Sequence, residues 1–344
     1  MTMSTQQDAA LSLVDENRQS SAERAHKADQ VRRILQNAGI VIPLAIVIIF
    51  ELLFVPKFLS ASNVTNMLIN ASILAILALG QTVVIAIFGI DLSVGAMQAL
   101  VVCVTAMMVN KMNPVLAIIC AIVFGGILGF FNGFVVVKLR VTDFIATLST
   151  MNIYRGLALL ITAGLPIEIM SGSFKKIATA SIVHIPVTFI LALLVGFGTW
   201  FILEKAPIGK HIVAVGDNAL AARDSGISVE GTIIKAYLFC GLTAGLAGVL
   251  LASQLGTVNA TVSTGLELQT IAVVVIGGTS MSGGHPRVIG TLLGALLLTI
   301  INSGLNILNI PSFYQYVAIG ALLVFALSLD SGQRVMVARM FKGR

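Results

Sequence analysis

The 344-residue sequence is poor in charge: Asp, Glu, Lys and Arg make up only 10% of it, whereas a soluble domain has about 25%. Hydrophobic residues make up 57%, and the mean hydropathy is +0.99. A water-soluble chain of this size could not bury so much apolar surface, so lipid must be the solvent for most of it. The scarcity of charge therefore excludes a soluble enzyme or binding domain.

Motifs that mark an enzyme active site are missing as well. The sequence has no G-x-x-x-x-G-K-[ST] loop for a nucleotide and no G-x-S-x-G nucleophile segment. Its few histidines and cysteines are not spaced as metal ligands. Cys103, Cys120 and Cys240 each lie inside an apolar run, which indicates free thiols rather than disulfides. We therefore expect no catalytic residue, metal or cofactor in this chain.

The charges that are present favour a membrane protein. The formal net charge is +6, but the basic residues are spread over short loops rather than gathered on one face, so nucleic acid is not an expected partner. Residues 1–37 are polar and lack the apolar core of a signal peptide. They are expected to form a cytoplasmic tail, either mobile or with a basic surface helix over 22–36. Residues 331–344 form a second, basic tail.

Ten apolar segments are long enough, or nearly so, to cross a bilayer, which takes about 20 residues. The sequence therefore predicts an all-α polytopic membrane domain over 38–330, with spans near 38–55, 64–87, 93–110, 114–137, 143–163, 182–203, 232–255, 267–281, 288–308 and 312–329. Sixteen of the 21 Lys and Arg residues then lie on one side, four lie on the other, and Arg155 lies inside a span. This asymmetry places both termini in the cytoplasm.

One carboxylate lies deep in this apolar sequence. Between residues 58 and 110 the only charged residue is Asp91, in the string "IFGIDLSVG". Gly89 and Gly95 weaken a helix, whereas Asp91 and Ser93 favour caps and turns. The string therefore predicts a helix break, or re-entrant segment, with Asp91 or Ser93 capping the next span. Two interpretations stay open: a purely structural cap, or a residue that shapes the gate of a polar path.

Other polar residues are expected at similar depth. Asn132, Asn152 and Arg155, with Asp91 and Ser93, are the candidates for a translocation path or gate. Arg155 needs an acceptor, either a helix carbonyl or Asp91. Glu51 near the outer end of the first span is expected to reach the interface.

A second glycine-rich string and one long loop complete the candidate sites. "VVIGGTSMSGGHPRVIG" (274–290) predicts another helix break at Gly278, Gly283 and Gly284. In the cytoplasmic loop at about 204–231, Asp217 or Asn218 can cap a short helix that ends at Gly226. Its alanine-rich face suits a groove on a partner, although a solvated helix is the simpler interpretation.

These strings occur in a definite order. "GIDLSVG" (89–95), "VAVGDNALAARDSGI" (213–227), "AVVVIGGTSMSGGHPRVIGTLLGALLL" (272–298) and "INSGLNIL" (301–308) together closely resemble the permease subunits of bacterial ABC importers for monosaccharides of the ribose, xylose, galactose and allose type. The resemblance covers about residues 40–330. Many relatives have a glycine where this chain has Phe88 and an acid where it has Gln269.

The resemblance implies a multi-pass subunit of the bacterial inner membrane that pairs with a second permease chain, expected to be identical. It implies two further partners: a periplasmic sugar-binding protein, which would set most of the specificity, and a cytoplasmic ATPase that binds ATP–Mg. The loop then becomes the segment that couples to the ATPase, through Gly209, Asp217, Asn218, Ala221, Ala222, Arg223 and Gly226.

The expected function is ATP-driven import of a monosaccharide, most simply a pentose such as ribose. An importer for inositol, autoinducer-2 or branched-chain amino acids is an alternative. An ion-coupled transporter is another alternative, although proteins of that class need several intramembrane carboxylates.

Overall fold

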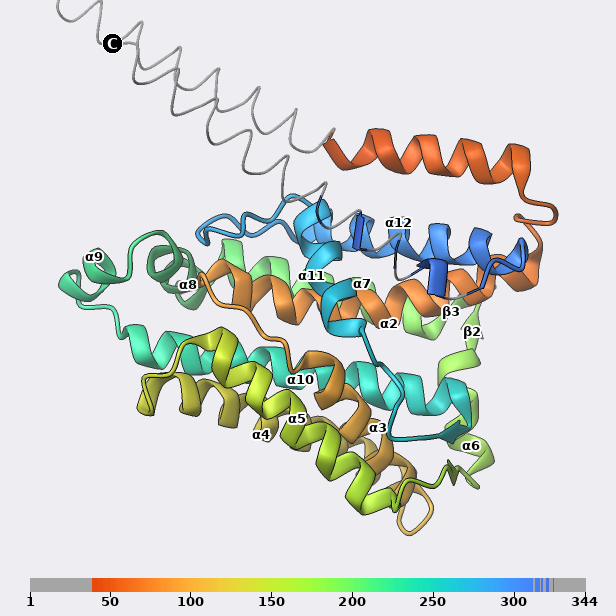
Figure 1. Ribbon diagram of the computed structural model, residues 1–344, viewed down its shortest axis with the longest axis horizontal. Coiled ribbons are helices and arrows are strands. Elements are labelled where there is room, and N and C mark those ends of the chain that lie inside the picture. The colour runs from red at the N-terminus through yellow and green to blue at the C-terminus, as the bar shows by residue number, and fades with distance from the viewer. Residues whose placement is uncertain (1–38, 312, 316, 318–319, 322–323, 325–344) are drawn as a thin grey trace, which may run out of the picture.

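Long apolar helices run side by side through the computed structural model, which describes residues 39–311, 313–315, 317, 320–321 and 324 (Figure 1). Six described helices are long and apolar enough to cross a membrane: α2 (Ala61–Ala86), α4 (Pro114–Lys138), α5 (Asp143–Thr162), α7 (Val187–Glu204), α10 (Val229–Leu255) and α12 (Val288–Ile307). Three shorter apolar helices are Gly39–Phe54, α3 (Val94–Val109) and α11 (Leu266–Ile276). The helical class is confirmed.

Nine of the ten predicted segments coincide with these helices. The tenth, 312–329, lies largely outside the described residues, as do the tails at 1–37 and 331–344. The count of ten spans and the orientation therefore stay predictions. Two boundaries differ by five residues: α7 begins at Val187 and α11 ends at Ile276. A β-hairpin occupies the residues before α7, and a glycine-rich loop follows α11.

Helix ends follow from local sequence. The Asn113 side chain accepts a hydrogen bond from the Val115 N–H at 2.9 Å, and Pro114 opens α4. Ser228 caps α10 in the same way, through the Gly231 N–H at 3.2 Å. These residues define where two of the long helices begin.

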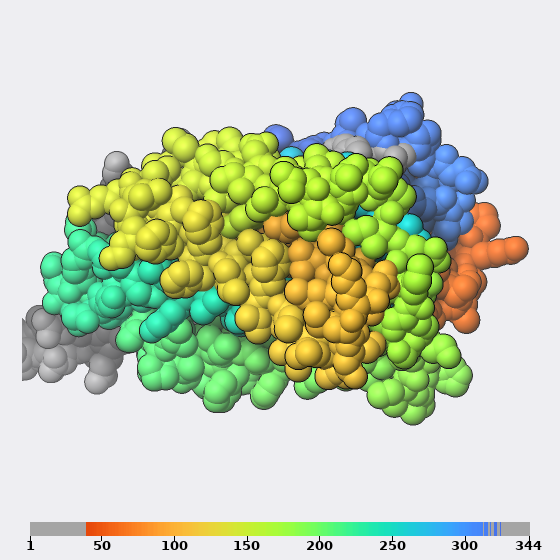
Figure 2. All heavy atoms as spheres, turned by 90° about the horizontal axis from the view of Figure 1, so that it is seen from below, coloured from red at the N-terminus to blue at the C-terminus, as the bar shows by residue number. Residues whose placement is uncertain are grey.

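Helix α2 lies at the centre of the bundle. In its most apolar window 89% of the residues are buried, against 28% in α5 and in α7. Side chains of α4 and α5, yellow to yellow-green in Figure 2, cover much of one outer face. These helices have exposed apolar side chains, as a lipid-facing surface requires.

Glycines bring α4 and α10 into close contact. A Cβ on Gly129 would overlap the Tyr237 carbonyl oxygen, and a Cβ on Gly241 would overlap the Gly125 carbonyl oxygen. Small residues at such a crossing allow two backbones to touch.

Short elements close the two ends of the bundle (Figure 1). At one end lie α6 (Gly172–Thr179) and two antiparallel pairs, β1 (Ile167–Glu168) with β4 (Thr257–Val258) and β2 (Ser181–Ile182) with β3 (Ile185–Pro186). At the other end lie α8 (Pro207–Asp217) and α9 (Ala219–Asp224).

Glu51 does not reach the interface as expected. It is only 5% exposed, and its carboxylate lies against Gly304 of α12, where a Cβ would overlap it. The absence of a side chain at Gly304 leaves the space that the carboxylate fills. Glu51 therefore belongs to the contact between helix Gly39–Phe54 and α12.

Candidate functional site

The predicted break between the second and third spans is confirmed: α2 ends at Ala86 and α3 begins at Val94. Side chains from other helices bind its irregular backbone. Asp143 of α5 accepts a hydrogen bond from the Ile90 N–H at 2.6 Å, and Tyr237 of α10 donates one to the Ile90 carbonyl at 3.2 Å. Irregular backbone at membrane depth persists only where protein satisfies it in this way.

Asp91 is the centre of a buried polar cluster. Its Oδ1 accepts hydrogen bonds from the Ser93 N–H at 2.8 Å and the Ser93 hydroxyl at 2.7 Å. The Asn132 amide donates to Ser93 Oγ at 2.7 Å and lies 3.3 Å from Asp91 Oδ2. Tyr154 donates to Asn132 Oδ1 at 2.8 Å, and the buried Cys240 lies beside the Asp91 side chain. We call these five residues the Asp91 cluster.

The cluster brings three predicted path residues together but seals them from solvent. Asp91, Ser93 and Asn132 are each 0% exposed. Their role as the lining of a translocation path stays a prediction. In this structure they stabilise the break between α2 and α3. The expected cap takes another form, because within the described residues the Ser93 side chain does not bind the first turn of α3, and Asp91 binds the N-cap residue itself.

The glycines of the first string have different roles from those expected. Gly95 lies inside the first turn of α3, not in the break, and a Cβ there would overlap the Ser263 carbonyl oxygen. Its role is close packing against the segment before α11. Gly89 lies in the break, but the left-handed backbone conformation falls on Phe88, with φ +65°. Left-handed backbone disfavours any residue with a Cβ.

Arg155 and Asn152 lie apart from the Asp91 cluster. Arg155 donates hydrogen bonds to the carbonyls of Ala260 at 3.1 Å and Val262 at 2.8 Å, in the segment between α10 and α11. Its partners are thus loop carbonyls rather than a helix carbonyl or Asp91. Asn152 is exposed and bonds the Leu148 carbonyl of its own helix at 3.0 Å.

The second predicted break is confirmed between α11 and α12. Gly278, Gly283 and Gly284 all have positive φ, of 87°, 79° and 77°, a conformation that glycine adopts without strain. The Gly284 N–H donates a hydrogen bond to the Ala86 carbonyl at 2.9 Å. The two breaks therefore touch each other.

The end of α8 is packed against both breaks. A Cβ on Gly216 would overlap the Ala86 carbonyl oxygen and approach the Gly284 nitrogen, and a Cβ on Gly284 would overlap the Asp217 carboxylate. We call the contact of Ala86, Gly216, Asp217 and Gly284 the junction. It is the point where the long loop meets the irregular parts of the bundle.

The predicted helix in the loop is confirmed as α9. Asn218, rather than Asp217, caps it: its Oδ1 accepts from the N–H groups of Leu220 at 3.1 Å and Ala221 at 3.0 Å. Asp217 instead ends α8, a helix that the sequence did not indicate. Gly226, with φ +81°, follows the end of α9 as expected.

The face that α9 presents differs from the expected alanine-rich one. Ala222 is 4% exposed and packs against its own protein, because α9 lies against α8 and α10. Gly209 is likewise buried, against the carbonyls at the end of α7. Leu220, 74% exposed, and Arg223, which pairs with Glu230, form the outward face.

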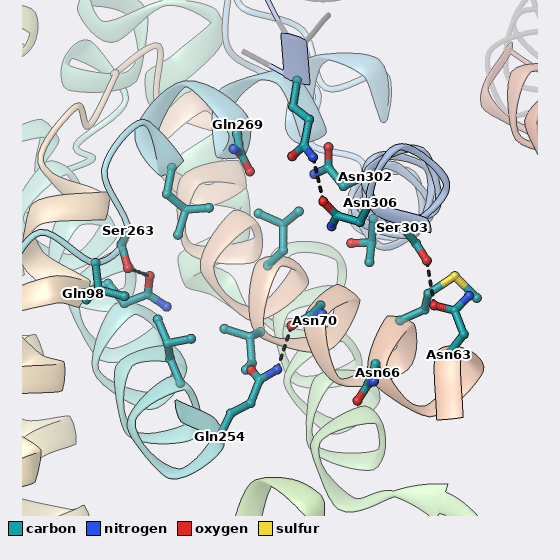
Figure 3. Close-up of a pocket in the computed structure, with 18 of the residues that line it drawn as sticks. Asn63, Asn66, Asn70, Gln98, Gln254, Ser263, Gln269, Asn302, Ser303 and Asn306 are labelled. Atoms are coloured by element: carbon teal, nitrogen blue, oxygen red, sulfur yellow. Dashed lines mark hydrogen bonds between the residues drawn. The ribbon is translucent and has the colours of Figure 1, made fainter. Parts of the chain in front are cut away.

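A polar cavity of about 790 Å³ opens between α2, α10, α11 and α12 (Figure 3). Side chains from these four helices, from α3, from the segment before α11 and from Gln315 line it, and among the described lining residues none carries a formal charge. The polar ones bear amides or hydroxyls: Asn63, Asn66, Asn70, Gln98, Gln254, Ser263, Gln269, Thr299, Asn302, Ser303, Asn306 and Gln315.

The spacing of the asparagines in the sequence is a signal for this cavity, although they form no recognised motif. Asn63, Asn66 and Asn70 recur at helical spacing and so share one face of α2. Asn302 and Asn306 do the same on α12. Gln269 of α11 also faces the cavity (Figure 3).

Comparisons with known proteins point in one direction. The chain is 39% identical, over 86% of its length and 93% of the relative's, to the ribose import permease protein RbsC of Bacillus subtilis. It is 38% identical over 83% of its length to the D-allose transport system permease protein AlsC of Escherichia coli, covering 88% of that protein. It is 35% identical over 90% of its length to the autoinducer 2 import system permease protein LsrC of Photorhabdus laumondii, covering 94% of it.

No solved structure matches the chain. A family model described as branched-chain amino acid transport system / permease component matches residues 63–327, which hold both helix breaks, the junction and the cavity. The chain therefore belongs to this family of transport permeases.

Proposed function

We propose that this chain is the membrane-spanning permease subunit of an ATP-driven importer that moves a monosaccharide, of the ribose type, across the bacterial inner membrane. Relatives named as ribose import permeases are 37–39% identical over 80–88% of the chain. The relative named for autoinducer 2 supports a second candidate substrate, at 35% identity.

The observation that carries the proposal is the junction. Gly216 and Asp217 end α8, and they contact Ala86 at the first break and Gly284 at the second. A partner that moves α8 and α9 would therefore act on α2, α3, α11 and α12 together. Gating requires contacts that differ between two states, and irregular segments are where a helix bundle can change shape at low cost.

The partner that moves α8 and α9 would be a separate ATPase chain with bound ATP–Mg. Leu220 and Arg223 are the side chains that α9 offers to it. The excess of Lys and Arg in the loops at this end supports a cytoplasmic location for it. A binding protein would deliver the sugar at the opposite end, and a second permease chain, expected to be identical, would complete the path. The exposed apolar faces of α4, α5 and α7 would contact lipid.

Co-purification tests the proposal. The tagged chain, extracted from its native membrane in mild detergent, should retain an ATPase subunit identified by mass spectrometry. ATP hydrolysis by that complex should rise when binding protein loaded with ribose is added, and rise less with empty binding protein. Stimulation only by autoinducer-2 would favour the second candidate. A complex without an ATPase, or one indifferent to binding protein, would contradict the proposal.

A further inference from the structure

Two amide side chains that line the cavity each have one buried atom without a described partner. Gln98 is 0% exposed; its Oε1 accepts a hydrogen bond from Ser263 at 2.8 Å, and its Nε2 has no partner in the described part of the chain. Gln254 donates to Asn70 Oδ1 at 2.8 Å, and its Oε1 is likewise without a described partner. Buried polar atoms nearly always have a hydrogen-bond partner, so these two atoms are candidates to bind a ligand.

The rest of the lining defines the chemistry of that ligand. Amides and hydroxyls supply both donors and acceptors, and none of the described lining residues could neutralise a charged group. A hydroxyl can accept from Gln98 Nε2 and can equally donate to Gln254 Oε1. Ile73, Leu74 and Leu251 add apolar surface for C–H groups. A neutral polyhydroxylated molecule meets all of these requirements, and a volume of about 790 Å³ accommodates one with water.

The cavity lies far from the junction. Asn70 precedes Ala86 by sixteen residues on the same helix, which is about 24 Å at 1.5 Å per residue. A solute at the cavity therefore sits in the half of the bundle opposite α8 and α9, where it would arrive before any gate at the junction.

We propose that this cavity is a binding subsite for a neutral monosaccharide or related polyol within the permease itself. The direction of passage rests on the proposed function, whereas the binding does not. The subsite would select against charged solutes such as sugar phosphates, so part of the specificity would lie in this chain rather than only in the binding protein.

Binding can be measured on the purified chain in lipid nanodiscs by saturation-transfer NMR. D-ribose and xylitol should both receive saturation and compete with each other, whereas ribose 5-phosphate should not. Asn66→Leu is the cleanest variant, because Asn66 forms no hydrogen bond within the described residues that the change would break. Loss of the Asn66 amide should weaken ribose binding about twofold to tenfold, the range for one neutral hydrogen bond. Gln98→Met should weaken it similarly.

Thr65→Val is the matched control. Thr65 is the neighbour of Asn66 on α2, lies outside the cavity and bonds the Ala61 carbonyl of its own helix at 2.8 Å. Its ribose signal should equal that of the unchanged chain. Absence of ribose transfer, equal transfer to ribose 5-phosphate, or unchanged affinity in both Asn66→Leu and Gln98→Met would overturn the subsite.

A transport assay separates failure of the subsite from failure of the proposed function. If the chain binds ribose in nanodiscs but the complete importer moves no monosaccharide into vesicles, the subsite stands and the proposed function fails. If the importer moves ribose equally well with Asn66→Leu and Gln98→Met, the function stands and the subsite fails.

Discussion

Replacement of Asp91 distinguishes an anchor for the helix break from a residue whose charge is needed. Asp91→Ala removes the acceptor for the Ser93 N–H and the Ser93 hydroxyl, and both are buried. Each buried donor left unpaired costs about 1–3 kcal/mol, so the loss of unfolding free energy should be about 2–6 kcal/mol.

Asp91→Asn keeps the shape and the oxygen that Ser93 uses. The new amide nitrogen would face the Asn132 amide, but Asn132 can turn over and accept from it. Tyr154 can then accept from Asn132, because the single proton of its hydroxyl can be donated to the Leu128 carbonyl, which lies 2.8 Å away. The free energy of unfolding of Asp91→Asn should therefore lie within about 1 kcal/mol of that of the unchanged chain, a change smaller than the cost of one unsatisfied donor.

The stabilities of the unchanged chain, Asp91→Ala and Asp91→Asn can be ranked by unfolding each in detergent and following tryptophan fluorescence or electrophoretic mobility. Sugar uptake in vesicles should fall with Asp91→Ala and survive in Asp91→Asn. Glu168→Ala, an exposed carboxylate in β1, is the control and should change stability by less than about 0.5 kcal/mol. Asp91→Asn as damaging as Asp91→Ala would refute the anchor and favour a role for the charge.

Three further changes test other parts of the structure. Phe88→Gly should raise the melting temperature by relieving left-handed backbone worth about 1–2 kcal/mol; a lower melting temperature would show that the ring contributes more than the strain costs. Gly129→Ala should prevent α4 from meeting α10, whereas Gly156→Ala, where a Cβ meets open space, should be tolerated when both are scored by folded yield. Arg223→Glu should leave insertion intact and change stability by less than about 1 kcal/mol, because its pair with Glu230 is exposed. It should lower sugar-stimulated ATP hydrolysis about tenfold, the effect of one charged hydrogen bond, and unchanged stimulation would remove α9 from the ATPase contact.

The spans could be predicted because length and hydropathy specify them directly. The segment predicted at 114–137 is α4, Pro114–Lys138. The break around Asp91 was also visible, since glycine and aspartate disfavour a helix. The same rule hid α8, because Gly209 and Gly216 argue against a helix. In the structure both glycines are points of close backbone contact, so packing outweighs their low propensity.

The site depends on contacts between distant segments, which a pattern search does not reveal. Asp143 binds Ile90 across 53 residues of sequence, and Gln254 binds Asn70 across 184. The spacing of the asparagines of α2 can be read from the sequence. The cavity that they line cannot, because α10 and α12 form its other walls. The burial of Ala222 could not be predicted for the same reason, because it depends on contacts with other parts of the chain.

Reconstitution in sealed vesicles is the decisive measurement. Labelled ribose should accumulate inside only when this chain, the ATPase and the loaded binding protein are all present with ATP–Mg, and omission of any one should abolish uptake. ATP hydrolysis by the purified chain alone, or ribose movement without its companions, would contradict a permease that takes its energy from a partner.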